Sequence, residues 1–182
     1  MAYNVPAYDT DKFSIGPGIL YLGPTGAEPT IDIGAVRSGM SVAITREKVD
    51  IEQGIPKTLV ETFTTKETGS ITLNGLEWNL DNLPYAMGAG TIVSTASNRV
   101  FKFGGTITFS KCALKFVHTQ PNGKNIIIRM FKARGAGDFT LSFADDPHEI
   151  PYVFDLLMAD TDWNGQALAV GEQLIEIEKQ LV

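Results

Sequence analysis

Apolar and polar residues alternate along most of this chain with a period of two, the pattern of strands that bury one face. The alternation is clear at residues 40–44 and again at residues 150–154. A short apolar run at residues 19–22 is bracketed by glycine and proline, which predicts a strand between two turns. A threonine-rich stretch over residues 62–73 favours another strand. Shorter alternations predict further strands at 101–103, 107–109, 139–143 and 168–178.

One pair of predicted strands is joined by an evident turn. Pro121-Asn122-Gly123-Lys124 separates residues 111–119 from residues 125–134. Asn-Gly is favoured in tight turns because both residues tolerate a positive φ. We therefore predict a β-hairpin here, with Gly135-Ala136-Gly137 turning the chain into the next strand.

Helical periodicity is confined to one segment, where large apolar residues recur at steps of four, three and four: Leu76, Leu80, Leu83 and Met87. This spacing predicts a helix over about residues 75–88. Asn74 is the expected N-cap and Gly88 the expected stop, while Pro84 would kink the helix or make its last turn a separate one. The predicted fold class is mainly β: an antiparallel β-sandwich or barrel with one flanking α-helix, and residues 155–158 are expected to turn helical briefly.

The alternation breaks at about residues 46–61, where charged residues crowd together around Gly54 and Pro56: Arg46, Glu47, Lys48, Asp50, Glu52, Lys57 and Glu61. We interpret this segment as an extended connection without an apolar face. Ordering such a segment is costly unless it docks on a partner. The same holds for an extended arm at residues 1–13, in which Tyr3, Val5 and Tyr8 would make the contacts. Residues 14–182 then form a single domain.

Length and composition agree with a protein that folds around its own core. The chain has 182 residues, of which 43% are hydrophobic and 20% charged, close to globular averages. Its one cysteine, Cys112, excludes an internal disulfide framework and a multi-cysteine zinc site. No apolar run is long enough to span a membrane, and the N-terminus lacks a signal-peptide pattern. We expect the protein to be made in a cytoplasm.

The net charge of −6 argues against a dedicated nucleic-acid-binding protein. The charges are nevertheless separated along the chain. Residues 82–137 contain eight basic residues and no acid, whereas residues 135–178 contain ten acids and no basic residue. Either the two blocks neutralise each other within one fold, or they form opposite faces on which copies stack head to tail.

Chemically suggestive groups are few, and they have simpler explanations. The five residues from Asp145 to Glu149 include possible metal ligands, but Asp-Asp-Pro is first a turn sequence. Asp160 and Asp162 could pair as acid and base, although Asn164-Gly165 marks an acidic loop. Cys112 and His118 share a predicted strand, about 20 Å apart, so they cannot act together, and Cys112 is expected to be buried. We predict no catalytic residue, no cofactor and no metal, and therefore no enzyme.

The segment from Phe13 to Pro24, followed by Asp32-Ile33-Gly34-Ala35-Val36, resembles the N-terminal portion of major tail tube proteins of long, non-contractile bacteriophage tails. The later pattern is similar too, through the single helix, Pro121-Asn122-Gly123 and the segment from Asp146 to Phe154. The resemblance implies a β-sandwich with one flanking helix, a fold shared with type VI secretion tube proteins. It also implies hexameric rings that stack into a hollow tube, bridged by the arm and the long loop.

By this resemblance the partners are other copies of the chain, together with the tape measure, tail terminator and distal tail proteins. DNA would pass through the lumen without sequence-specific binding, because lumen carboxylates repel its phosphates. The protein would be assembled in the bacterial host cytoplasm and would reside in the virion tail, with no membrane association. A monomeric β-sandwich binding module for carbohydrate or adhesion is the alternative. An enzyme ranks third, and it would need a cleft built from Asp145, Asp146, His148, Asp160 and Asp162.

Overall fold

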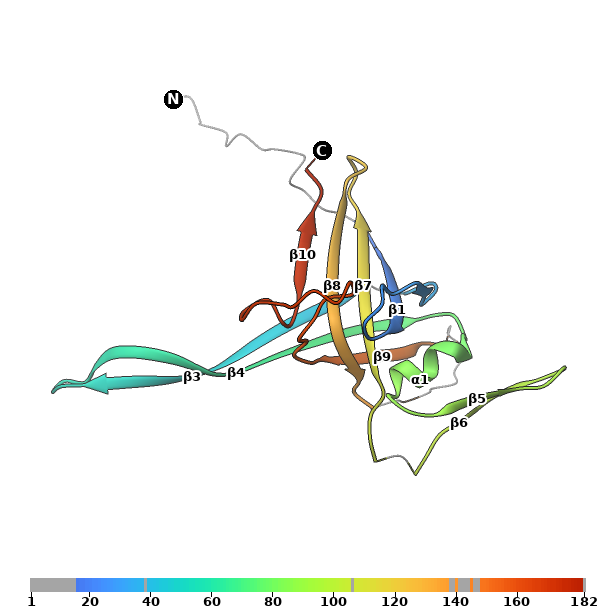
Figure 1. The fold of residues 1–182 in the computed structure, drawn as a ribbon, viewed down its shortest axis with the longest axis horizontal. Helices are drawn as coiled ribbons and strands as arrows, with labels where there is room; N and C mark the ends of the chain where they lie inside the picture. The colour runs from blue at the N-terminus through green and yellow to red at the C-terminus, as the bar shows by residue number, and fades with distance from the viewer. Residues whose placement is uncertain are drawn as a thin grey trace.

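The structure is a computed structural model, and it describes residues 16–37, 39–105, 107–137, 140, 145 and 148–181. Within these residues the fold is mainly antiparallel β with one short α-helix, as the periodicity predicts. Eight strands form the main sheet in the order β2-β1-β7-β8-β9-β4-β3, with β10 paired to β8 beside β9 (Figure 1). Two further strands, β5 and β6, form a separate hairpin.

The strands, in chain order, are β1 (Ile19–Pro24), β2 (Ile31–Asp32), β3 (Ser41–Gln53), β4 (Thr58–Gly75), β5 (Thr91–Ser94), β6 (Arg99–Lys102), β7 (Lys111–Thr119), β8 (Asn125–Gly135), β9 (Ile150–Leu156) and β10 (Glu176–Lys179). The predicted hairpin is confirmed as β7 and β8, which pair from Thr119–Asn125 down to Lys111–Arg134. The strands expected at residues 19–22, 40–44 and 150–154 are also present.

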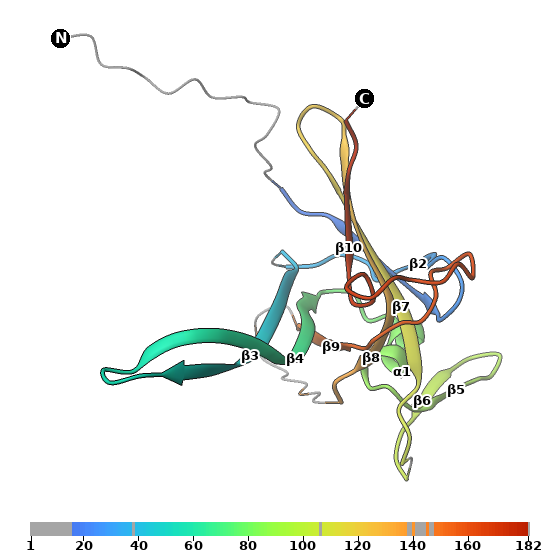
Figure 2. The same ribbon diagram turned by 60° about the vertical axis from the view of Figure 1, so that its left-hand side comes forward.

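The main sheet curls until its two sides meet, and the chain between β2 and β3 makes the closing contact. At its start Ile33 donates its N–H to the carbonyl of Leu20 in β1. Further along, the carbonyl of Ala35 accepts from Leu76, and Arg37 donates to Asn74 at the end of β4. One chain segment therefore hydrogen-bonds both sides of the sheet and closes a barrel (Figure 2).

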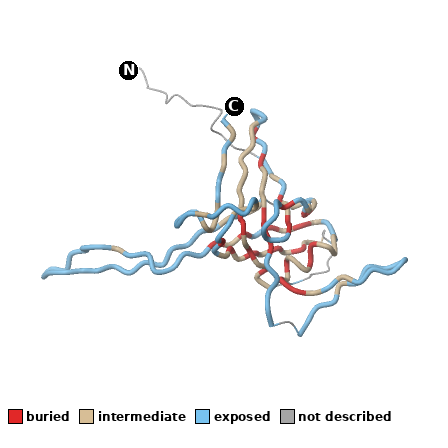
Figure 3. Tube along the Cα trace, in the orientation of Figure 1, coloured by how far each residue is buried: buried red, intermediate tan, exposed pale blue. Residues whose placement is uncertain are grey.

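Side chains that alternate inward along the barrel strands form the core. In β9 the buried positions are Ile150, Tyr152, Phe154 and Leu156, each separated by a more exposed residue. Ile71 and Leu73 of β4 and Leu22 of β1 reach the same cluster. Figure 3 shows that burial is concentrated in this barrel, whereas the outer part of β3–β4 and the β5–β6 hairpin are exposed along most of their length.

The predicted helix over 75–88 is wrong in extent. Residue 75 still belongs to β4, and the helical part consists of a 3-10 turn η2 (Leu80–Asn82) and the α-helix α1 (Leu83–Ala86). Asn74 is therefore a strand residue and not the N-cap; Asn79 caps η2 by accepting from the Asp81 N–H. Pro84 lies in the first turn of α1, where it needs no N–H partner. Gly88 follows the C-cap with φ +63°, as expected of a helix stop.

Three smaller predictions also differ from the structure. Residues 107–109 form no strand, residues 155–158 continue or follow β9 without a helical turn, and the last strand begins only at Glu176. The strand expected at 139–143 falls almost wholly outside the described residues. None of the described helices is long and apolar enough to cross a membrane.

The charged segment at about 46–61 is not a loop. β3 and β4 continue through it as paired strands and turn only at residues 54–57. The part beyond the barrel, residues 45–68, is exposed throughout except for the half-buried Thr62. We call this part the ribbon. In Figures 1 and 2 the ribbon and the β5–β6 hairpin extend from opposite sides of the barrel.

Candidate assembly surfaces

The ribbon brings together the charged residues that the sequence singles out between 46 and 61. Near the barrel two cross-strand ion pairs hold its strands: Arg46 Nε lies 2.6 Å from Glu67 Oε1, and Lys66 Nζ lies 3.1 Å from Glu47 Oε1. Farther out, Asp50 accepts a hydrogen bond of 2.7 Å from the Thr62 hydroxyl. Cross-strand pairing of this kind stabilises an isolated hairpin only modestly.

The outer ribbon carries charges that have no ion-pair partner among the described residues. Apart from Asp50, these are Lys48, Glu52, Lys57 and Glu61, all with exposed side chains. Glu61 Oε1 accepts only a hydrogen bond of 3.0 Å from the adjacent Thr62 N–H. A two-stranded ribbon with unpaired charges gains little from folding in isolation. Its charges are therefore left available for contacts outside the described chain.

The ribbon also has an apolar face, which the sequence interpretation missed. Val49 lies directly opposite Phe63, and Ile51 lies opposite Glu61. Because side chains two residues apart share a face of a strand, all four project from the same side. Val49, Ile51 and Phe63 are each about half exposed, at 53%, 48% and 54%. Val49 and Ile51 do alternate with charged neighbours, so a period-2 signal was present in the sequence.

The three residues predicted to make contacts from the N-terminal arm, Tyr3, Val5 and Tyr8, lie outside the described residues. The described chain begins at Gly16. Pro17, the second described residue, lies beside β7, because its carbonyl accepts from Nδ1 of the buried His118 at 2.8 Å.

Three residues of the basic block pair with four residues of the acidic block within the described structure. Arg129 of β8 bonds both Glu176 and Glu178 of β10, Arg134 lies 3.2 Å from Asp155, and Lys132 lies 3.7 Å from Asp160. For these residues, the interpretation that the two charge blocks neutralise each other within one fold therefore holds. Burial lowers the pKa of Arg129, but its bonds to the two glutamates outweigh that effect and raise the pKa.

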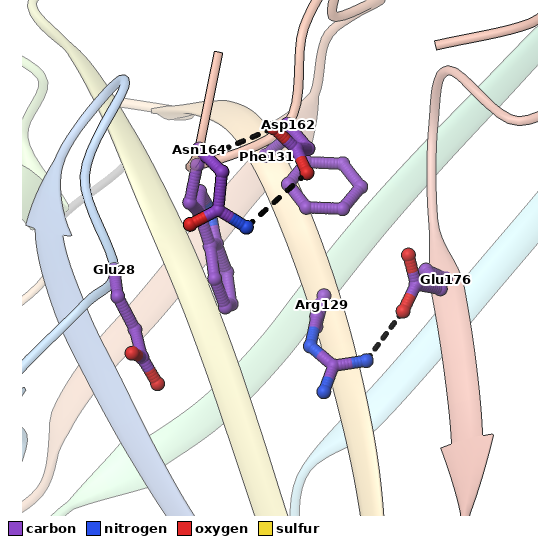
Figure 4. Close-up of a pocket in the computed structure, with 7 residues that line it drawn as sticks. Glu28, Arg129, Phe131, Asp162, Asn164 and Glu176 are labelled. Atoms are coloured by element: carbon purple, nitrogen blue, oxygen red, sulfur yellow. Dashed lines mark hydrogen bonds and ion pairs between the residues drawn. The ribbon is translucent and has the colours of Figure 1, made fainter. Parts of the chain in front are cut away.

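A cavity of about 270 Å³ lies between the β10 side of β8 and the loop that follows β9. It is lined by Glu28, Arg129, Phe131, Asp162, Trp163, Asn164 and Glu176 (Figure 4). Trp163 packs edge-on against Phe131, with ring centroids 5.3 Å apart. Lys115 donates to Glu28 at 2.6 Å and holds the pKa of that carboxyl below its ordinary value. The charged side chains that line the cavity are thus engaged within the chain: Arg129 with Glu176, Glu28 with Lys115, and Asp162 with the N–H groups of its own turn.

An enzyme would need a cleft built from residues 145–148 together with Asp160 and Asp162. In the described structure Asp160 and Asp162 are engaged with separate partners and do not act as a pair. Asp160 faces Lys132, whereas Asp162 accepts from the N–H groups of Asn164 and Gln166, each at 2.8 Å, and so shapes its own turn. Asp146 lies outside the described residues. Among the described residues no group of three or more His, Cys, Asp or Glu side chains could hold a metal ion.

Cys112 is buried, as predicted, with its Sγ 3.6 Å from the carbonyl oxygen of Ala133. Burial raises the pKa of its thiol to about 12. A nucleophilic cysteine needs the opposite shift, because the thiolate is the reactive form. Cys112 is thus a packing residue of the core.

Comparison with known proteins adds no identification, since no protein-family model and no curated protein matches the chain.

Proposed function

We propose that the protein is a structural subunit that assembles head to tail into a hollow tube of stacked hexameric rings, the tail tube of a long, non-contractile bacteriophage tail. The observation that carries the proposal is the ribbon. It extends far from a closed barrel, and it exposes an apolar face and unpaired charges that gain nothing in a monomer. Such a surface fits a protein that is completed by its neighbours.

The role proposed is structural rather than enzymatic. Tape measure, tail terminator and distal tail proteins would be further partners at the ends of the tube. A tube formed by an acidic protein suits DNA transit, because carboxylates in the lumen repel the phosphate backbone and prevent tight binding. Assembly would take place in the host cytoplasm, and the product would reside in the virion.

Negative-stain electron microscopy beside light scattering, over a concentration series, tests the proposal. Rings or hollow tubes of uniform diameter are the expected result. The informative variant replaces residues 48–65 by Asn-Gly, so that the Glu47–Lys66 pair flanks a two-residue turn. This variant should keep its thermal unfolding transition and remain monomeric. Tubes formed by the shortened variant would contradict a role of the ribbon in assembly.

A monomeric binding module is the alternative, and the observation that favours it is the cavity beside Trp163. A binding module would stay monomeric at every concentration, with or without its ribbon. Trp163 fluorescence would then change on titration with a glycan panel. A wild-type protein that shows both results is a binding module and not a tube subunit.

A further inference from the structure

The β5–β6 hairpin presents a second exposed surface on the side of the barrel away from the ribbon. Thr91 pairs with Lys102, and Val93 pairs with Val100. By the alternation of strand side chains these two pairs share one face, whereas Ile92 and Phe101 point to the other. Val93 and Val100 are each 43% exposed. We call the first of these two faces, formed by Thr91, Val93, Val100 and Lys102, the β5–β6 surface.

A shallow groove of about 380 Å³ borders the surface, and Thr91, Lys102 and Phe103 are among its lining residues. Phe103 is 55% exposed, and its ring stacks on Phe101 with centroids 6.3 Å apart. An aromatic ring that is already held by a neighbour offers contact area at little further cost in conformational entropy. Because Phe101 points to the other face of the hairpin, Phe103 borders the groove from that side and lies outside the Val93–Val100 face.

Lys102 has no ion-pair partner among the residues that the structure describes, so it can pair with an external acid. Most residues of the basic block are bonded within the chain: Arg99 to Asp81, Lys115 to Glu28, Arg129 to the two β10 glutamates, Lys132 to Asp160 and Arg134 to Asp155. Lys124 donates to the Leu181 carbonyl. Within the described part of the chain, Lys102 and Lys111 are the two members without a carboxylate or carbonyl partner.

The ribbon matches this surface pair by pair. Its apolar pair Val49–Phe63 is followed, one step along the same face, by the pair Ile51–Glu61. The β5–β6 surface has the apolar pair Val93–Val100, followed on the same face by Thr91–Lys102. Each face thus carries an apolar cross-strand pair next to one unpaired charge, and the two charges are opposite in sign. Complementary charge fixes the register and orientation of such a contact.

We propose that the Val49–Phe63 face of one copy docks on the β5–β6 surface of the next copy, with Glu61 paired to Lys102. This inference rests on the proposed self-assembly and deepens it by naming the two contacting surfaces. The two hairpins extend from opposite sides of the barrel (Figures 1 and 2), so each contact leaves one ribbon and one β5–β6 surface free. Contacts of this heterologous kind propagate from copy to copy.

Charge exchange tests the pairing. Glu61→Lys alone and Lys102→Glu alone should each raise the protein concentration needed for assembly at least about tenfold, because two like charges then meet at the contact. The double variant carrying both substitutions should assemble like the wild type. Glu172→Lys and Lys111→Glu, which reverse exposed charges outside both surfaces, serve as controls and should leave assembly unchanged.

A disulfide test reports the contact directly. The double variant Glu61→Cys, Lys102→Cys should give a ladder of covalent oligomers after mild oxidation of assembled material, whereas either single variant should give none. The native Cys112 is 1% exposed and should not interfere. If tubes form but neither charge rescue nor a ladder is seen, this inference is overturned while the proposed function stands. If the wild type never associates, the proposed function fails and the inference fails with it.

Discussion

Val49 and Phe63 face each other across the ribbon, outside the barrel, and each keeps more than half of its side-chain surface exposed to solvent. A cross-strand apolar pair normally stabilises a sheet by packing against a further layer. Here the described chain supplies no such layer. The relationship is therefore better explained by contact between copies than by the stability of one copy.

Replacing both residues, in a Val49→Ser, Phe63→Ser variant, should abolish assembly while leaving the barrel intact. The free energy of unfolding should change by no more than about 0.5–1 kcal/mol, because neither side chain reaches the core. Sedimentation velocity and thermal unfolding measure the two effects. Val170→Ser is the matched control, since Val170 is exposed and lies on neither hairpin. A loss of assembly in that control would mean that any exposed apolar residue matters.

The packing of α1 on the end of β8 depends on Gly135. A Cβ added there would lie 2.1 Å from the carbonyl oxygen of Ala86, which is backbone and cannot rotate away. Gly135→Ala should therefore destabilise the fold by about 1–3 kcal/mol, which lowers the melting temperature by roughly 2–4 °C per kcal/mol in a domain of this size. Gly39→Ala, where a Cβ meets nothing within 4 Å, is the control and should be neutral. Equal melting temperatures for the two variants would refute the contact.

Arg129 holds β10 to the barrel, since it bonds both Glu176 and Glu178. Arg129→Ala should cost about 1–2 kcal/mol, between the values for exposed and for buried pairs, because two like charges then lie side by side. Hydrogen exchange at residues 176–179 should quicken before exchange in the rest of the sheet. Arg99→Ala removes the more exposed pair with Asp81 and should leave β10 unaffected. Unchanged exchange in Arg129→Ala would show that backbone pairing alone holds the strand.

Alkaline pH should weaken the fold through two buried acids. Burial raises the pKa of Cys112 from 9.0 to about 12 and that of Tyr152 from 10.0 to about 12. From about pH 9 for Cys112 and about pH 10 for Tyr152, the unfolded chain releases the proton while the folded chain keeps it. The free energy of unfolding then falls as pH rises toward 12, by up to about 1.4 kcal/mol per pH unit for each group.

Denaturant titrations at intervals from pH 8 to pH 11 measure this slope. Cys112→Ala should remove the part of the slope that begins near pH 9. In the wild-type protein, the Cys112 thiol should also resist alkylation at pH 8 until the protein is unfolded. Rapid alkylation under native conditions would contradict the burial of the thiol.

Signals between close neighbours in the chain predicted structure well. Asn122-Gly123 specifies its turn locally, and the alternation in β9 reports a burial pattern that one strand displays by itself. The predicted helix was too long because long-range hydrogen bonds hold its first residues in an extended conformation. The backbone of Asn74 and Leu76 bonds the segment that closes the barrel, and the periodicity of residues 76–87 contains no information about that partner.

The ribbon was misread for a different reason. Its strands are stabilised by pairing with each other and not by burial, so the usual contrast between a core face and a solvent face is weak. Lys48, Asp50 and Glu52 make the segment look purely charged, although Val49 and Ile51 alternate with them. The β5–β6 surface could not be predicted from the sequence either. That Lys102 lacks an acidic partner becomes visible only when the structure shows which carboxylates the other basic residues bind.

β4 runs without interruption for 18 residues, from the outer ribbon to the closing contact of the barrel. At about 3.3 Å per residue this is a span of roughly 60 Å. A force applied to the ribbon would therefore be carried along one strand directly to Ile71 and Leu73 in the core. Because β3 and β9 flank that strand, the load would act as shear across many hydrogen bonds at once and would not peel them apart singly. A tube linked through such strands would resist tension along its length while its individual contacts stay weak.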